Sequence, residues 1–595
     1  MGRTLRALGL GLGTSYRADR ARTVGVFALS LATALVGVLT AWFLKVIVDE
    51  AAQGDETGAL AGAAGVAVVV GLGMLASATR TRMLFPLKEH TGLALDQRLV
   101  DLAGGTATIE HHERPAFVAQ VDVLRREGHV LASSALNVAG GLEVVVEAVA
   151  TGLLLAWVAP ALLAIPLFAV PSLWAGARAE RSRQQALEDT ADDVRRARHL
   201  FELATSPAPG KEVRVFGLGP ELLARHRSAL ESADAQLDRA ARLGVLWTLG
   251  GWLTFAAGYG AAVLLVVKGA VEGSATVGDV VLALTMIAQI NEQVAGAVGS
   301  VSALARTVRV TGRYLWLAEY AAAGARRAGD EVAVPERLTG GIDLDGVGFR
   351  YPEGGRDALH DVTLSIPAGT TVALVGENGA GKTTLVKLLC RLYQPTSGAV
   401  RVDGVDLATL DVEEWRSRIS AAFQDFTRFE LTAGQAVGVG DLPHLDDPVA
   451  VGAALERARA ADVPAALADG LDTPLGTSFE GGTELSGGQW QKLALARAMM
   501  RPAPLLLVLD EPTAALDAEA EHELFARYTS RARSVVTGTN AVVVLVSHRF
   551  STVHTADLVV VLEGGRVVES GSHAQLMAAG GLYAELYELQ ARSYR

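Results

Sequence analysis

Residues 376 to 384 read GENGAGKTT, and their types and spacing suit contact with phosphate groups. The stretch fits G-x-x-x-x-G-K-[ST] and lies between an apolar strand pattern at 371 to 375 and an apolar helix pattern at 385 to 390. Glycines let backbone N–H groups and a helix N-terminus face phosphates, while a lysine adds positive charge and a threonine offers Mg²⁺ a hydroxyl. A Gly-rich turn that binds nothing is the alternative. The predicted contacts are Gly376, Glu377, Asn378, Gly379, Ala380, Gly381, Lys382, Thr383 and Thr384.

Three further apolar strand patterns end in polar residues that suit nucleotide chemistry. Gln424, in AAFQDF, can reach Mg²⁺ or an attacking water, and Asp510, after LLLVL, can hold Mg²⁺ through water. Glu511 is placed to polarise water against a γ-phosphate, as a catalytic base must. His548, after VVVLVS, is a candidate γ-phosphate sensor, although a histidine after a strand is more often structural. Tyr351, in FRYP, can stack on adenine, and a core tyrosine is the alternative.

The stretch ELSGGQWQKLALARA, residues 484 to 498, contains LSGGQ at the start of a predicted helix, whose positive end suits an anion. With the phosphate loop, the strand-end residues and AALD at 514 to 517, it closely resembles the ABC transporter ATPase domain. In that family two chains pair, and each ATP lies between one chain's phosphate loop and the other's LSGGQ. The resemblance implies nucleotide contacts from Ser486, Gly487, Gly488 and Gln489, with Asp517 at the dimer interface. It also implies that Glu480, in TSFEGG, lies where the ATPase domain senses membrane-domain loops.

The rest of the chain must position this site, and its composition points to a membrane. Half of the 595 residues are hydrophobic, and the mean hydropathy is +0.30. Arginines before the first apolar run predict a cytoplasmic N-terminus. Six runs approach the roughly 20 residues that cross a bilayer: 23 to 48, 59 to 78, 134 to 158, 160 to 176, 245 to 267 and 277 to 302.

The predicted fold class is an α-helical six-span transmembrane domain followed by an α/β P-loop ATPase domain of the ABC type. We expect a transmembrane domain at 1 to 320, a linker at 321 to 340 and a nucleotide-binding domain at 341 to 595. The cytoplasmic loops, 79 to 133 and 177 to 244, read as long helices. Their turns, at 111 to 117 and 204 to 217, could dock on the ATPase domain, or the loops could be solvated hairpins.

Six spans ahead of one ATPase domain resemble the half-transporter architecture of ABC exporters. The resemblance implies ATP and Mg²⁺ as cofactors, a second chain as partner and a location in the plasma membrane, with the ATPase domain cytoplasmic. Since the motif set is complete, we expect a homodimer that exports a peptide, antibiotic, drug or lipid across the lipid bilayer. An ATP-gated channel or regulatory membrane protein is the alternative, while the spans exclude a soluble ABC ATPase. The negative charge of the nucleotide-binding half argues against nucleic acid as a partner.

Two further predictions concern buried chemistry. The single cysteine, Cys390, lies on the apolar side of the helix after the phosphate loop and is expected to be buried. Glu143 and Glu147 share a helical face of the third span, and Glu292 lies on the sixth. Ionisable groups in a membrane usually face a watery cavity or a partner. We therefore expect either an acidic cavity that favours cationic or amphipathic substrates, or pairing that holds the helices together.

Overall fold

The computed structural model describes residues 2–158, 160–273, 275–325, 332–352, 354–478, 480–510, 538–547 and 553–593. These residues divide into two units, which are described separately. The helical unit comprises residues 1–104 and 120–319, and the sheet unit comprises residues 105–119 and 320–595. The predicted linker at 321 to 340 stays a prediction, because residues 326–331 lie outside the described part.

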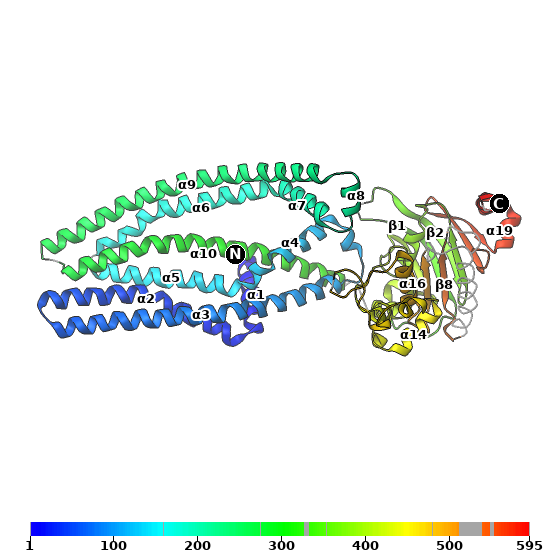
Figure 1. Cartoon of the computed structure of the whole chain (residues 1–595), viewed down its shortest axis with the longest axis horizontal. Coiled ribbons are helices and arrows are strands. Elements are labelled where there is room, and N and C mark those ends of the chain that lie inside the picture. Colours follow the sequence, from blue (N-terminus) through cyan, green and yellow to red (C-terminus); the bar gives the residue numbers. More distant parts are fainter. Residues whose placement is uncertain are drawn as a thin grey trace. The chain divides into compact units, whose positions relative to one another are not determined.

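Long helices build the helical unit, and several exceed the thickness of a bilayer (Figure 1). The 49 residues of α3 give a rod of roughly 70 Å at about 1.5 Å per residue. The long helices are interrupted at both predicted turns. A short 3₁₀ helix, η1 (Glu110–Glu113), lies at the first turn, and a short α-helix, α8 (Gly210–Val215), lies at the second. The other helices are α1 (Gly2–Ala18), α2 (Arg20–Gln53), α3 (Glu56–Gly104), α4 (Pro115–Ala132), α5 (Ser134–Val158), α6 (Ile165–Asp189), α7 (Ala191–Thr205), α9 (Gly219–Val271) and α10 (Val277–Ala325).

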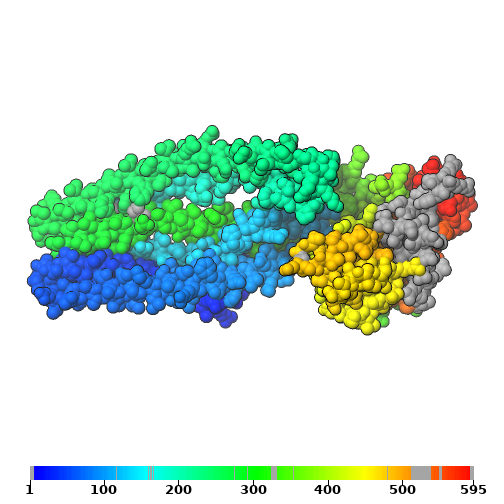
Figure 2. Space-filling model, in the orientation of Figure 1, coloured from blue at the N-terminus to red at the C-terminus, as the bar shows by residue number. Residues whose placement is uncertain are grey.

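Glycines let neighbouring helices of this unit approach closely. A Cβ at Gly65 of α3 would lie 2.5 Å from the Phe43 ring of α2, and a Cβ at Gly258 of α9 would lie 2.4 Å from Phe168 of α6. Small residues at such contacts are common between membrane helices, where packing rather than water drives association. The pairs α2 with α3 and α6 with α9 are accordingly the most extensive helix contacts (Figure 1). Figure 2 shows the face of the unit open in places between α9 and the helices below it in that view.

Five described helices are long and apolar enough to cross a membrane: α2, α3, α5, α9 and α10. They match five of the six predicted spans. The predicted fourth span corresponds to the 3₁₀ turn η2 (Pro160–Ala164) and α6, which is not among the five. Its apolar part ends at Ala177, and charged residues begin at Arg178. Six spans are therefore compatible with the structure, which establishes five candidates.

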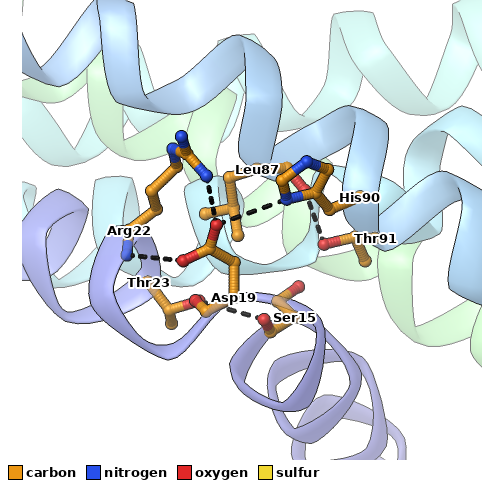
Figure 3. A network of polar contacts seen from close by, with 7 residues as sticks. All are labelled: Ser15, Asp19, Arg22, Thr23, Leu87, His90 and Thr91. Carbon is orange, nitrogen blue, oxygen red and sulfur yellow. Dashed lines mark hydrogen bonds and ion pairs between the residues drawn. The ribbon is translucent and has the colours of Figure 1, made fainter.

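A polar network fixes the elbow between α1 and α2 (Figure 3). Asp19 caps α2, because its side chain accepts the backbone N–H of Arg22 at 3.0 Å. The same carboxylate lies 3.3 Å from Nδ1 of His90 on α3 and pairs with the Arg22 guanidinium. Thr23 Oγ1 donates to the carbonyl oxygen of Ser15 at 3.1 Å. These contacts join α1, α2 and α3 on the side where the chain enters its first span.

The sheet unit contains two sheets. The four-stranded sheet is antiparallel, in the order β2-β1-β4-β5. In the six-stranded sheet, β10-β9-β3-β8-β7-β6, all neighbours are parallel except β10 and β9. The strands are β1 (Gly341–Arg350), β2 (Asp357–Pro367), β3 (Thr371–Val375), β4 (Ser397–Val402), β5 (Val405–Asp406), β6 (Ile419–Ala422), β7 (Leu506–Asp510), β8 (Val542–Val546), β9 (Leu558–Glu563) and β10 (Arg566–Gly571).

The central strands β3, β7 and β8 are buried along their whole length, which explains their continuous apolar sequences. A second core forms among short helices that include α13 (Ala433–Gly438), α14 (Pro448–Arg457) and α16 (Gly487–Ala498), around the buried Trp490. The helix α11 (Lys382–Leu389) follows β3 and packs into the main core. The fold is therefore an α/β domain, as predicted, and the structure adds that its larger sheet is mostly parallel.

Candidate nucleotide-binding site

A cavity of about 670 Å³ lies where the parallel strands of the larger sheet end. In open α/β sheets, ligands bind in the crevice outside the carboxyl ends of the strands. The loop after β3 and the segment after β6 both contribute side chains, and Val546 lies at the end of β8. The lining residues are Tyr351, Ala358, Asn378, Gly379, Gly381, Lys382, Thr383, Thr384, Gln424 and Val546. Eight of these ten were predicted as site residues.

The phosphate loop has a backbone that requires glycine. Gly376, Gly379 and Gly381 have φ of 147°, 84° and 104°. A Cβ at Gly376 would lie 2.1 Å from the backbone oxygen of Leu562, so any side chain there would displace the loop or β9. Gly381 ends the loop and caps α11, whose N-terminus therefore faces the cavity. A loop of this geometry ahead of a helix N-terminus can present backbone N–H groups to an anion.

Lys382 folds back over the loop. Its ammonium group donates to the carbonyl oxygens of Gly376 at 2.8 Å and Glu377 at 2.9 Å. These hydrogen bonds hold the ammonium above the loop at the cavity wall. A lysine in this place supplies a compact positive charge for phosphate oxygens. Ala380 is buried beneath the loop and packs in the main core.

Side chains with oxygen atoms suited to a hard cation lie at the cavity or beside it. Thr383 Oγ1 lies 3.4 Å from Oδ2 of Asp510, a carboxylate at the end of β7 that is only 2% exposed. Gln424, whose side chain carries an amide oxygen, also lines the cavity. Mg²⁺ is usually bound through one or two carboxylates together with phosphate oxygens and water, rather than by a full protein cage. The residues present therefore fit Mg²⁺, and among the described residues no cluster of three or more His, Cys, Asp or Glu forms a metal site.

Tyr351 lies at the cavity with its hydroxyl group 3.1 Å from Thr384 Oγ1. Its ring packs edge-on against Phe349 and Tyr393, with centroids 4.9 and 5.5 Å apart. The ring is thus held in place and only partly buried, which leaves surface for stacking. Tyr351 thus packs against the core and also lines the cavity, and its stacking on adenine stays a prediction.

The LSGGQ segment lies away from this cavity. Ser486 caps α16 in a capping box with Gln489: its hydroxyl accepts the Gln489 N–H at 3.3 Å, and its own N–H donates to the Gln489 side chain at 2.9 Å. Ser486 and Gly487 are exposed, and Gly488 is half-buried. Glu480 is exposed in a turn before the helix. Of the other predicted residues, Glu511, Asp517 and His548 lie outside the described part of the chain.

The first predicted docking turn belongs to the sheet unit. Ile109 donates its N–H to the Leu392 carbonyl at 3.0 Å and packs against the main core. Arg416 donates to the Ala107 carbonyl, and Lys387 pairs with Glu113 at 3.2 Å. We call residues 105–119 the docking loop. Its contacts support docking rather than a solvated hairpin for this turn.

Several residues near the site were not predicted from the sequence. Lys387 lies one turn beyond Thr383 on α11 and contacts Tyr351, and its spacing of four residues was the available clue. Tyr393 also contacts Lys387 and Tyr351, and it does not belong to any motif that would have identified it. Cys390 behaves as predicted: it is 3% exposed, and burial raises the pKa of its thiol to about 12.

Comparisons with known proteins agree with this geometry. The family model described as ABC transporter matches residues 359–514, which run from β2 to just beyond β7. Among curated relatives, the ATP-dependent lipid A-core flippase of Bordetella avium is 41% identical over 257 residues, or 43% of this chain and 42% of the relative. The flippase of the same name from Methylococcus capsulatus is 44% identical over 258 residues, or 43% of this chain and 41% of the relative. The chain thus matches about two fifths of the length of these relatives.

A solved structure covers far more of the chain. The structure of a bacterial Atm1-family ABC exporter with ATP bound matches with a TM-score of 0.78 and 25% identity, over 96% of this chain and 98% of that one. Together with the five span-length helices, this likeness indicates a multi-pass membrane protein. The chain has an ABC transporter ATPase domain and the architecture of an ABC exporter half-transporter.

Proposed function

We propose that this chain is one half of a homodimeric exporter that couples ATP hydrolysis to moving a substrate outward across the plasma membrane. One observation carries the proposal: a phosphate loop with Thr383 beside Asp510 lies on the same chain as five span-length helices. We infer that the N-terminus and the ATPase domain are cytoplasmic, because arginines precede the first span.

The names of the curated relatives bear on the substrate class. The curated relatives are named for lipid A-core, which favours an amphipathic, lipid-like substrate. The matched part is only two fifths of their length, so peptides, antibiotics and drugs stay in the proposal. The proposed lipid, peptide, antibiotic and drug substrates share an apolar part that can enter the helical unit from the bilayer or the cytoplasm.

We assign roles to the site residues as follows. Lys382 and the loop N–H groups bind the β- and γ-phosphates, and Tyr351 stacks on adenine. Thr383, Gln424 and Asp510 would hold Mg²⁺, which supplies charge neutralisation at the phosphates when bound. Glu511 takes the proton of the attacking water, and His548 contacts the γ-phosphate.

The signature residues support the dimer. The start of α16 is exposed and does not line the chain's own cavity, so it is available to a nucleotide held by a second chain. We propose that Ser486, Gly487, Gly488 and Gln489 complete the partner's site, with Asp517 at the interface. Because one chain carries the whole motif set, two identical copies would make two competent sites.

The test uses the full chain reconstituted in lipid vesicles, with ATP hydrolysis and transport of a panel of fluorescent lipids, peptides and cationic drugs measured together. We expect one class to stimulate hydrolysis and to move in an ATP-dependent manner. Lys382→Ala should abolish ATP binding. Glu511→Gln should retain ATP binding, lose nearly all hydrolysis and trap the closed dimer, since an amide cannot take the proton.

Two results would contradict the proposal. Wild-type turnover in Glu511→Gln would remove the assigned base. An inactive monomer that needs a second, different chain would refute the homodimer, and native mass measurement in nanodiscs decides this point. ATP-dependent ion conductance without substrate transport would favour the channel alternative.

A further inference from the structure

Lys387 of α11 lies between the docking loop and the nucleotide cavity. Its ammonium nitrogen is 3.2 Å from Glu113 Oε1, in the docking loop. The same nitrogen lies 5.4 Å from the centroid of the Tyr351 ring and 5.6 Å from that of Tyr393. One side chain thus contacts both a loop residue 274 positions earlier in the chain and the aromatic ring at the cavity.

The surroundings keep this ammonium charged and in place. Burial opposes the charge, but Tyr351 and Glu113 outweigh it, so the pKa of Lys387 lies above its ordinary value. Burial and the Glu113 carboxylate together raise the pKa of Tyr393, which therefore stays neutral. The Lys387 side chain is 25% exposed, so its contacts are only partly screened by water.

Tyr351 in turn contacts the phosphate loop. Its hydroxyl group lies 3.1 Å from Thr384 Oγ1, and its ring lines the cavity. A cation over an aromatic ring attracts it through the ring's quadrupole, and that attraction orients the ring as well as stabilising it. Lys387 is therefore one of the contacts that orient the Tyr351 ring, beside Phe349 and Tyr393, and Glu113 is one of the groups that hold Lys387 there.

We propose that Lys387 is a positioning residue that links the docking loop to nucleotide affinity through the base-stacking ring of Tyr351. When Glu113 holds Lys387 over the ring, the ring is fixed for stacking; when the loop withdraws Glu113, the ring is released and affinity falls. The inference rests on the proposed ATP site, and it gives that site a contact with the docking loop.

The experiment compares ATP with inorganic tripolyphosphate, which carries the phosphates without a base. Binding of each is measured to the full chain in nanodiscs by competition against a fluorescent ATP analogue. The variants are Glu113→Gln, Lys387→Met, their double variant and Lys387→Arg. Glu110→Gln is the matched control, because Glu110 lies in the same short helix but pairs with Arg114.

We expect Lys387→Met and Glu113→Gln each to weaken ATP by about 3- to 10-fold, a range that corresponds to a partly exposed cation–π contact. Tripolyphosphate affinity should stay unchanged, and so should ATP affinity in Glu110→Gln. Lys387→Arg should retain most of the wild-type ATP affinity, because a guanidinium also stacks on aromatic rings. In the Lys387→Met background, Glu113→Gln should have no further effect, because its route to the ring is gone.

Three results would overturn the inference. An equal effect of Glu113→Gln with and without Lys387 would show that the loop acts by another route. A parallel loss of tripolyphosphate would show a general disturbance of the phosphate loop, and unchanged ATP affinity in both single variants would remove the link. Lys382→Ala separates the two proposals: if it binds both probes normally, the proposed phosphate site is wrong, whatever Lys387 does. If Lys387→Met fails to fold, Glu113→Gln with its two probes still decides.

Discussion

Arg80 of α3 and Glu143 of α5 form an ion pair with a nitrogen-to-oxygen distance of 2.6 Å. Thr33 of α2 donates to the second carboxylate oxygen of Glu143 at 2.9 Å, so the carboxylate joins three helices. Both charged side chains are about a quarter exposed. The pairing interpretation of the membrane acids therefore holds for Glu143, and the acidic-cavity interpretation needs correction there.

The first prediction concerns this pair. Glu143→Gln leaves the Arg80 guanidinium inside the helical unit without its carboxylate partner. Arg80→Met leaves the Glu143 carboxylate without its guanidinium partner. We expect each single variant to cost about 1–3 kcal/mol of stability, because an unpaired charge loses its charge-assisted hydrogen bonds while staying partly desolvated. The unfolding midpoint of the full chain in detergent measures it.

The control and the double variant sharpen this test. Arg80→Met with Glu143→Gln should be less destabilised than the sum of the singles, because no lone charge remains. Glu292 is exposed, so Glu292→Gln should leave the midpoint unchanged. If Glu143→Gln were as stable as wild type but selectively lost transport of cations, a pathway role for Glu143 would be restored.

The acidic-cavity interpretation still applies to Glu147 and Glu292. Glu147 is hydrogen-bonded to Gln293, which also donates to Thr151 Oγ1 at 2.8 Å. The Glu292 side chain is exposed in this unit. The second prediction is that Glu147→Gln with Glu292→Gln preserves folding and basal ATP hydrolysis but weakens transport of cationic substrates more than of neutral ones. Equal transport of both classes in vesicles would leave the acidic cavity without support.

The phosphate loop and the strand ends beside the cavity could be predicted from the sequence because their patterns are local. A loop of nine residues carries its own glycine geometry, and Asp510 and Gln424 follow buried strands whose carboxyl ends must meet at one edge of a parallel sheet. The contact of Lys387 with Glu113 could not be predicted in the same way, because it joins residues 274 positions apart. The ion pair of Glu143 with Arg80 could not be predicted for a similar reason. Helical periodicity places Glu143 on one face of its helix but does not show which residue of another helix lies next to it.

The third prediction concerns the backbone of the phosphate loop. Gly376→Ala would place a Cβ 2.1 Å from the Leu562 backbone oxygen at a φ of 147°, so the loop must shift. We expect at least about 2 kcal/mol of destabilisation and loss of ATP binding. Gly452→Ala is the control: it lies within α14 with no atom near its Cβ, and alanine there should stabilise the helix by about 0.5–1 kcal/mol. Retained ATP affinity in Gly376→Ala would contradict the assigned loop geometry.

The fourth prediction is a pH dependence at Asp403, between β4 and β5. Its carboxylate accepts the N–H groups of Thr339, Gly340 and Gly341, at 2.8–2.9 Å for the shortest contact of each. Burial opposes the charge, but these donors outweigh it and lower the pKa of Asp403 below its ordinary value. A lowered pKa means stability that is present above the unfolded value, about 3.9, and is lost as the pH falls through the folded value.

Asp403→Asn should therefore cost about 1–2 kcal/mol at pH 7, with a difference from wild type that shrinks below about pH 4. Asparagine tolerates the φ of 49° at this position, so the change isolates the charge. Asp361→Asn is a matched control with the same φ on an exposed residue, and it should be neutral. Unfolding midpoints between pH 7 and pH 3.5 measure the effect. A constant difference over that range would show that the carboxylate charge is not involved.

Near the predicted external ends of the spans, Lys45 of α2 is only 7% exposed. Its ammonium group lies 2.7 Å from Asp49 Oδ2 on the same helix and 2.8 Å from Asp279 Oδ1 on α10. Its nitrogen is also 5.3 Å from the centroid of the Trp157 ring, at the end of α5. Asp49 in addition accepts the N–H of Gly278 at 2.8 Å. These contacts tie the ends of α2, α5 and α10 together.

The last prediction is that Lys45 keeps the external ends of these helices closed, because opening them would separate a buried cation from two carboxylates. Breaking such a pair inside a protein is costly when one partner stays buried and alone. Lys45→Met should therefore widen the distance distribution between spin labels at Gln53 and Ala275 in the full chain without nucleotide. Lys268→Met is the matched control, because Lys268 is exposed and its ion pair is local, with Glu272 just beyond the end of α9 at 3.7 Å. Identical distributions in Lys45→Met and wild type would show that apolar packing alone closes this end, and a widening in Lys268→Met as well would show that external charge in general, rather than this network, sets the distance.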